Sequence, residues 1–134
     1  MHTYNFEKLD VWEKSRKLVV KIYKLTKDFP IDEKYGMVSQ MRRAAVSICS
    51  NIAEGSGRTT SKDQSRFYTN VYSSLLELLN QVLIAEELGW VNSNEVLAFR
   101  KMAEEVSNKI NALRNAALKR LNASTTQHLN NSTT

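Results

Sequence analysis

The fold of this chain is decided by residues 40–55, which read QMRRAAVSICSNIAEG. Apolar side chains recur there at steps of three and four residues, which is the period of one face of an α-helix. With one residue from the preceding turn they form an apolar stripe: Met37, Met41, Ala44, Ile48 and Ile52. A polar stripe runs beside it: Gln40, Arg43, Ser47, Asn51, Glu54 and Arg58. Since the residues between the stripes are mostly small, the segment predicts a helix that neighbouring helices can approach closely.

Three other segments show the same period, so the sequence predicts four helices, at about 9–28, 33–55, 61–88 and 92–121. Pro30 ends the first, because a residue before proline is disfavoured in helical geometry. Gly55-Ser56-Gly57 ends the second, and the capping-box pattern Ser61-x-x-Gln64 begins the third. Short connections between long amphipathic helices predict an all-α, up-down-up-down four-helix bundle over residues 1–122. Residues 123–134 are rich in Ser, Thr, Asn and Gln, which predicts a frayed or disordered polar tail.

The core is predicted from the same periodicity. The first helix should turn inward Leu9, Trp12, Val19, Ile22 and Thr26, with Leu18, Leu25 and Phe29 flanking. The fourth should bury Phe99, Ala103, Val106, Ile110, Leu113, Ala117 and Leu121. The third should bury Tyr68, Val71, Leu75, Leu78, Val82 and Ala85, with a second apolar row of Tyr72, Leu76, Leu79 and Leu83 beside it. That double row covers more of the helix than one bundle seam requires, which predicts contact with another subunit.

Composition limits the compartment and the kind of partner. Nineteen basic and fourteen acidic residues give a net charge of +5, which favours polyanions or acidic surfaces but is equally typical of a solubilising charge. Cys49 is the only cysteine, so neither an intramolecular disulfide nor a thiol cluster for a metal is possible, and it is interpreted as core filler. We find neither an N-terminal apolar signal region nor an apolar run near the ~20 residues of a membrane span, so we expect a cytoplasmic protein.

Four lysines form a ridge on the first predicted helix: Lys14, Lys17, Lys21 and Lys24. The ridge spans ~15 Å at the helical rise per residue, and it is predicted to point away from the core. It is a candidate contact for nucleic-acid phosphates, which Arg42 of the second helix extends, although a solvated lysine face is the ordinary alternative. No aromatic residues interleave the ridge, which argues against base stacking there.

A polar network is predicted between the second and third helices. If these helices are antiparallel, Arg43 lies near Glu77 and Glu54 lies near Arg66. We expect the first pair to be partly or wholly buried, in a network that fixes the register of the two helices. Its members are Gln40, Arg43, Asn51, Glu54, Arg66 and Glu77. The alternative is a polar pocket for a ligand or an acid–base pair.

Signatures of enzymes are missing from the sequence. The two histidines, His2 and His128, are terminal, so neither the Glu-x-x-His pairs of di-iron bundles nor a serine–histidine pair can form. The glycines at 55 and 57 lack a preceding strand and a following Lys-Ser/Thr, so they do not form a phosphate-binding loop. The sequence therefore predicts a protein that is not an enzyme and has no cofactor or metal.

Several motifs, taken in order, resemble a known family. They are Phe6-x-x-Leu9-x-Val11-Trp12, Phe29-Pro30, Tyr35-Gly36, the segment 40–55, Gly57-Arg58 and Ser74-Leu75-x-Glu77. Over about residues 4–121 the chain is similar to the four-helix-bundle proteins encoded in intervening sequences of bacterial large-subunit ribosomal RNA. Val71 and Ser73 depart from the small Ala and Gly usual before the last motif.

The resemblance implies a bundle that assembles as a ring-like homopentamer. Similar bundles include the accessory variability determinants of diversity-generating retroelements, which are basic pentamers that bind nucleic acid and the reverse transcriptase. Because this kinship is one of fold, function stays open between two hypotheses. The first is a non-enzymatic oligomer that binds RNA or DNA, or a ribonucleoprotein or reverse-transcriptase partner. The alternative is a structural or adaptor oligomer that binds another protein and has no nucleic-acid role.

Overall fold

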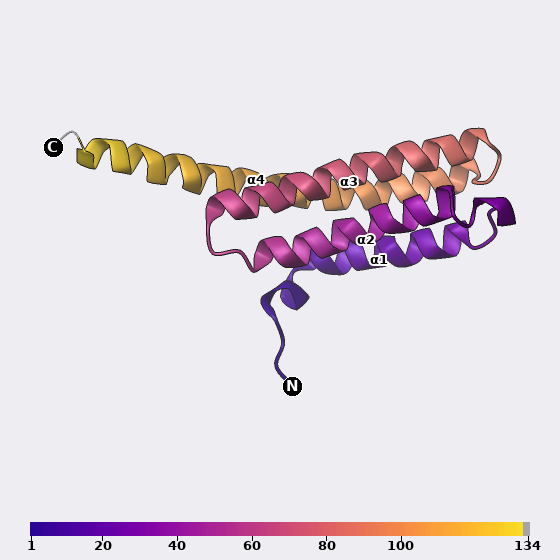
Figure 1. The fold of residues 1–134 in the computed structure, drawn as a ribbon, viewed down its shortest axis with the longest axis horizontal. Coiled ribbons are helices and arrows are strands. Elements are labelled where there is room, and N and C mark those ends of the chain that lie inside the picture. The colour runs from indigo at the N-terminus through magenta and orange to yellow at the C-terminus, as the bar shows by residue number, and fades with distance from the viewer. Residues whose placement is uncertain (133–134) are drawn as a thin grey trace.

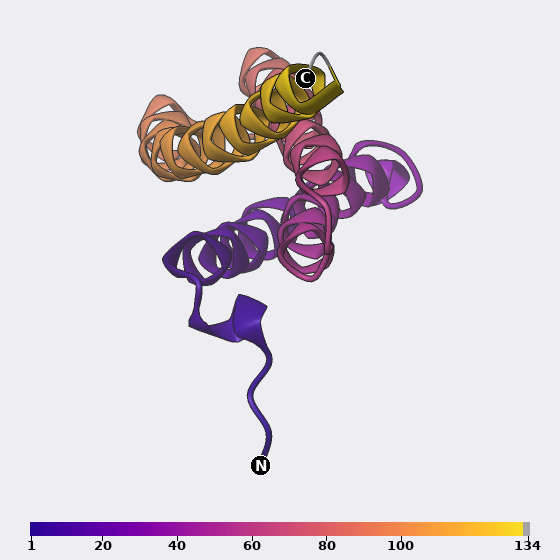
Figure 2. The same ribbon diagram turned by 90° about the vertical axis from the view of Figure 1, so that its left-hand side faces the viewer.

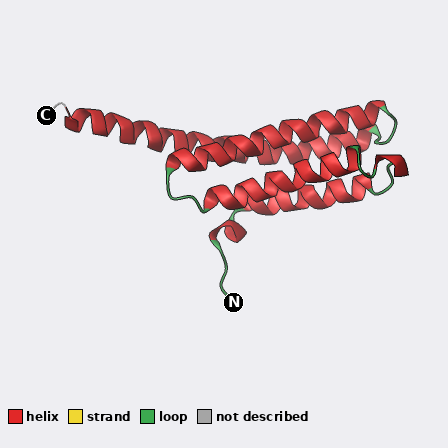
Figure 3. Cartoon of the chain, in the orientation of Figure 1, coloured by secondary structure: helices red, strands yellow, loops and turns green. Residues whose placement is uncertain are grey.

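The computed structural model describes residues 1–132 as four α-helices with two short 3₁₀ turns, and these residues contain no strand (Figures 1 and 3). The helices are α1 (Asp10–Thr26), α2 (Met37–Ser56), α3 (Ser61–Glu87) and α4 (Ser93–Ser132), and the turns are η1 (Asn5–Lys8) and η2 (Ile31–Glu33). Successive helices run in opposite directions along one axis (Figure 1). The predicted all-α fold with four helices is therefore confirmed.

α2 begins later than the sequence predicted. Pro30 is followed by the turn η2, and Gly36 has non-helical backbone angles of φ −107° and ψ −112°. The carboxylate of Glu33 accepts a hydrogen bond from the backbone N–H of Met37 at 3.0 Å, which satisfies one of the free donors at the start of α2. Glu33, which was predicted to begin the helix, therefore lies before it and caps it.

The other two connections lie where the sequence predicted them, but the predicted Ser61–Gln64 capping box does not form. Ser61 is already the first residue of α3, and the Gln64 amide donates to the carbonyl oxygen of Arg58 at 3.2 Å. Thr60 caps α3, since its hydroxyl accepts a hydrogen bond from the backbone N–H of Asp63 at 3.2 Å. Gly89 has φ +80° and lets the chain leave α3, an angle at which a residue with a Cβ would be strained. Asn92 and Glu95 then form a reciprocal capping box at the start of α4, with bonds of 2.8 and 3.0 Å.

The core matches the prediction fully in α3, it matches in α2 and α4 except at the half-buried Met37, Leu113 and Leu121, and it is rotated in α1. Every predicted core residue of α3 is buried, as are Met41, Ile48 and Ile52 of α2. The buried residues of α1 are Val11, Ser15, Leu18, Ile22 and Thr26. The predicted inward residues Leu9, Trp12 and Val19 are only half-buried and pack at the edge of the core.

Ser15 explains the rotation of α1. Its hydroxyl lies 2.7 Å from the carbonyl oxygen of Trp12 and 3.3 Å from the sulfur of Cys49, so its polar atom is satisfied within the seam with α2. A small side chain at this position lets α2 approach, and the larger apolar side chains cover the rim of the seam. Hydrophobicity alone assigned the large residues to the core and overlooked the small polar one.

α4 is much longer than α3 and extends beyond the bundle (Figure 1). Near the start of α3, Arg120 donates to Ser61 at 3.4 Å and to Gln64 at 3.0 Å. The helix continues to Ser132, so the prediction of a disordered tail is wrong for the described part of that segment. Adding a residue to an existing helix forms a hydrogen bond without the cost of nucleation, so a polar sequence can extend it.

The four seams of the bundle differ in how tightly they pack. α2 with α3 and α3 with α4 make the most extensive contacts, whereas α1 meets α4 least (Figure 2). At Gly55 an added Cβ would lie 2.9 Å from the Cβ of Phe67, so α2 and α3 approach too closely there for any larger residue. Within residues 1–132, no helix is both long and apolar enough to cross a membrane.

Candidate nucleic-acid interface

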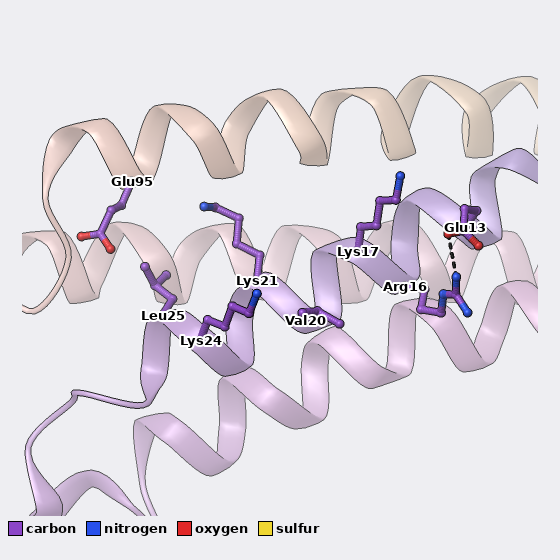
Figure 4. A pocket seen from close by; sticks show the side chains of 8 residues that line it. All are labelled: Glu13, Arg16, Lys17, Val20, Lys21, Lys24, Leu25 and Glu95. Atoms are coloured by element: carbon purple, nitrogen blue, oxygen red, sulfur yellow. Dashed lines mark hydrogen bonds and ion pairs between the residues drawn. The ribbon is translucent and has the colours of Figure 1, made fainter.

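The open side of the bundle forms a groove between α1 and α4 (Figure 4). Its volume is about 730 Å³, and it is lined by Glu13, Arg16, Lys17, Val20, Lys21, Lys24, Leu25 and Glu95. Three of the four predicted ridge lysines belong to it. Lys17 and Lys21 point toward α4 rather than directly away from the bundle (Figure 4). The predicted ridge is thus one wall of a groove.

The fourth ridge lysine is already paired. The ammonium of Lys14 lies 3.0 Å from the carboxylate of Glu105 on α4, and Lys109 lies 2.7 Å from Asp10 in the same seam. The hydrogen bond from Lys109 holds the pKa of Asp10 below its usual value, and the hydrogen bond to Glu105 raises the pKa of Lys14. These two ion pairs join the beginning of α1 to α4. Lys14 was predicted to be a phosphate contact, but it is already paired with Glu105.

The remaining groove lysines are available to a ligand. Lys17, Lys21 and Lys24 form no ion pair with any residue that the structure describes. The two carboxylates of the groove have other partners: Glu13 binds Arg16 at 2.7 Å, and Glu95 accepts the capping bond from the N–H of Asn92. The groove is lined by four cationic side chains and two carboxylates, so its net charge is positive, although only Glu13 is paired with a cation.

Arg42 proves to be a structural residue. Its side chain donates to the hydroxyl of Thr26 at 3.0 Å and to the carbonyl oxygen of Tyr23 at 3.3 Å, and its guanidinium stacks 4.5 Å from the centre of the Tyr23 ring. A cation at the end of α1 satisfies carbonyl groups that have no partner within the helix. Arg42 thus joins α2 to α1 and does not extend the lysine ridge.

The predicted polar network between α2 and α3 forms only in part. Arg43 and Glu77 line one open hollow with Gln40, but both are exposed, and neither forms an ion pair with any of the described side chains. Glu54 pairs with Arg58 at 3.8 Å and Arg66 with Asp63 at 3.7 Å, each within its own helix. The predicted burial and the predicted cross-helix pairs are therefore wrong.

Small hydroxyl side chains make the contact that the charged ones were expected to make. Ser47 and Ser74 lie 2.9 Å apart across the seam, and the side-chain amide of Asn51 donates to the carbonyl and the hydroxyl of Ser47 at 2.8 and 3.1 Å. Because small residues bring α2 and α3 together, the long arginine and glutamate side chains extend outward to water instead of across the seam.

The described residues offer little for covalent or metal chemistry. They contain no group of three or more His, Cys, Asp or Glu side chains that could hold a metal ion. Burial raises the pKa of the Cys49 thiol, which disfavours the reactive thiolate. His2 packs against the ring of Tyr4, while the side chain of His128 lies outside the described residues.

Sequence reasoning overlooked two groups of residues near the ridge. Glu13, Arg16 and Val20 complete the groove, and their spacing along α1 could have shown that they share its flank. Tyr23 and Tyr35 line a second basic hollow between α1 and α2. No periodicity predicts that hollow, because Tyr35 lies between η2 and α2, where the chain is irregular.

Comparison with known proteins agrees with the motifs. Residues 7–112 match the family described as 23S rRNA-intervening sequence protein. The fold is similar to the crystal structure of a protein of unknown function from the S23 ribosomal protein family of Bacteroides thetaiotaomicron, with a TM-score of 0.72 and 18% identity. That likeness covers 78% of this chain and 95% of the other. None of the curated proteins matches. The family match spans most of the sequence, and the chain therefore belongs to the 23S rRNA-intervening sequence protein family.

Proposed function

We propose that the protein is a non-enzymatic homo-oligomer that binds RNA phosphates in the groove between α1 and α4. The observation that carries this proposal is the set of three unpaired lysines on one helix, Lys17, Lys21 and Lys24, beside carboxylates that already have partners. Cations held without a protein counterion are favourable sites for a phosphate backbone.

The spacing of the lysines is compatible with a nucleic-acid strand. Lys17 and Lys24 are about 10 Å apart along the axis of α1, from the rise of a helix. One strand of a duplex places a phosphate about every 3.4 Å along its axis, so the groove has room for about three phosphates. Lysines that bind phosphates do not read base edges, so we expect little sequence preference. The family description, which refers to 23S rRNA, favours RNA over other polyanions.

Two observations support self-association: exposed apolar residues on and just after α3, and the homopentamer that the family resemblance implies. Leu76 and Ile84 of α3 and Leu88 at its C-cap are 49, 41 and 53% exposed, so they are available for contact with a second copy of the chain. A ring of copies would repeat the groove, and several weak phosphate contacts would then act together. Sedimentation equilibrium at micromolar concentration should give an oligomer, most simply five subunits, and a stable monomer would contradict this part of the proposal.

The RNA proposal is tested by removing three positive charges from the groove and comparing the result with a control variant that loses three positive charges elsewhere. The variant Lys17→Gln/Lys21→Gln/Lys24→Gln should bind RNA more weakly. The slope of its log binding constant against log salt concentration should become shallower by about two to three units, because about three phosphate contacts are lost. The matched control is Lys8→Gln/Lys62→Gln/Lys119→Gln, which removes three exposed lysines that lie outside α1. Both variants should keep the helical content and sedimentation behaviour of the parent.

Equal losses in the two triple variants would show that net charge, and not the groove, attracts RNA. The adaptor alternative is favoured by the same exposed apolar residues of α3. It would be supported by tight, salt-insensitive binding to a protein together with no RNA binding at low salt.

A further inference from the structure

A second basic hollow lies between the end of α1 and the beginning of α2. Its volume is about 490 Å³, and its charged lining residues are Lys34, Arg42 and Arg43, with no carboxylate among the lining side chains. Carboxylates do line two neighbouring hollows: Glu13 and Glu95 line the α1–α4 groove, and Glu77 lines the hollow between α2 and α3. This hollow therefore gathers three cationic side chains, of which Arg43 also lines the neighbouring hollow that contains Glu77.

Two tyrosine rings line the same hollow and are open to solvent. Tyr23 is 42% exposed and Tyr35 is 87% exposed. Tyrosine is enriched where a protein contacts a ligand or partner, because its ring is apolar and its hydroxyl is polar. The Lys34 ammonium lies 5.4 Å from the centre of the Tyr35 ring, so cation and ring are presented together.

Arg42 makes one side of the hollow rigid. Its hydrogen bonds to Thr26 and to the Tyr23 carbonyl fix the guanidinium against the Tyr23 ring. Thr26 is 1% exposed and also bonds to the carbonyl of Ile22 at 2.8 Å, so the support is itself anchored in the core. A flat stack held in this way requires little reordering when a planar ligand arrives.

We propose that this hollow takes an unpaired nucleotide of RNA, with its base against the tyrosine rings and its phosphate beside Arg43 and Lys34. The combination of flat rings with unpaired cations matches a nucleotide, since bases stack on aromatic and guanidinium planes while phosphates need cations. An acidic peptide would satisfy the cations but would leave the rings without a planar partner. The volume is also within the range of small-ligand sites.

The inference rests on the proposed function and makes it more specific. Tyr23 is adjacent in sequence to Lys24, and neighbouring residues of a helix point about 100° apart. α1 therefore presents lysines on one flank and the tyrosine hollow on the other, so one strand that crosses the end of α1 can reach both. A duplex can use the lysines but cannot place a base in the hollow, because its bases are paired and stacked.

The test compares short labelled oligouridine with an RNA duplex of matched length, using the full chain and one salt concentration. Tyr35→Leu should weaken oligouridine binding roughly 5- to 100-fold, the range for loss of one base stack, and leave duplex binding unchanged. Tyr35→Phe keeps the ring and should bind like the parent. Tyr4→Leu, which removes another exposed tyrosine far from the hollow, is the matched control and should have no effect.

Each outcome separates this inference from the function on which it rests. Parent-like binding of oligouridine by Tyr35→Leu would overturn the nucleotide site while leaving the lysine groove intact. No binding of either RNA by the parent would overturn both. Displacement of oligouridine by micromolar AMP would assign the hollow to a free nucleotide instead of RNA. A change in oligomeric state in Tyr35→Leu would show that a second copy of the chain covers the hollow, which also overturns the assignment.

Discussion

The seam between α2 and α3 and the seam between α1 and α4 have opposite characters in one bundle. The first is closed by apolar residues, by small residues such as Gly55, and by a contact between two serine hydroxyls. The second is held at one end by two solvent-exposed ion pairs and opens at the other into a groove lined by lysines.

The difference separates what stabilises the fold from what is left free to bind. Burial of apolar area is the dominant stabilising contribution, and exposed ion pairs contribute little. The α2–α3 seam therefore accounts for much of the stability of the bundle. The α1–α4 seam can keep unpaired cations because folding does not depend on its closure.

The largest expected difference between the seams comes from truncating one apolar side chain in each. Ile48→Ala removes a side chain with no exposed surface, and it should lower the free energy of unfolding by about 2–5 kcal/mol. Val20→Ala in the groove removes a side chain that is 48% exposed and should change stability by less than about 0.5 kcal/mol. Urea unfolding measures both. Similar losses would show that the two seams contribute alike.

A smaller effect should come from the close approach at Gly55. In Gly55→Ala the new Cβ would meet the Cβ of Phe67 at 2.9 Å, so one helix must shift. We expect a loss of about 1–2 kcal/mol, because overpacking outweighs the gain in helix propensity. At Gly57 an added Cβ would meet only carbonyl oxygens, at 3.7 Å or more, so Gly57→Ala is the control and should be nearly neutral. A stabilised Gly55→Ala would mean that the seam has room to spare.

The smallest effect should be the pH dependence of the α1–α4 ion pairs. The pKa of Asp10 lies below its usual 3.8 in the folded protein, so its stabilising contribution is present above the unfolded pKa and lost as the pH falls through the folded pKa. Asp10→Asn should therefore be slightly less stable than the parent near neutral pH and equal to it in strong acid. Denaturant midpoints at the two pH values test this, and a difference that persists in acid would point to another role for Asp10.

The sequence was most informative where periodicity and burial agree. All six predicted core positions of α3 are buried, and α4 begins at Ser93, next to the predicted start at residue 92. The rotation of α1 was missed because Ser15 reaches its partners only once α2 is in place. Hydrophobicity along one helix cannot indicate such a contact.

The candidate site was less predictable because its properties depend on pairs of residues distant in the sequence. The ridge lysines were found from their spacing, yet Lys14 is paired with Glu105, 91 residues away. Arg42 looked like a surface cation, but its partners lie at the end of the preceding helix. The arginine and glutamate pairs between α2 and α3 failed for the same reason, since a register predicts proximity and not the direction of a long side chain.

The limited contact between α1 and α4 also affects the rate at which α1 opens locally. α1 is supported mainly by α2, so it is the helix that can detach by breaking the fewest contacts. In local opening, such a helix separates while the other three stay packed, and its amide protons then exchange with solvent earliest. A strand of RNA bound along the lysines would be bound to that same helix. Its residence would slow the opening of α1, so bound RNA would appear as slower amide exchange in residues 10–26.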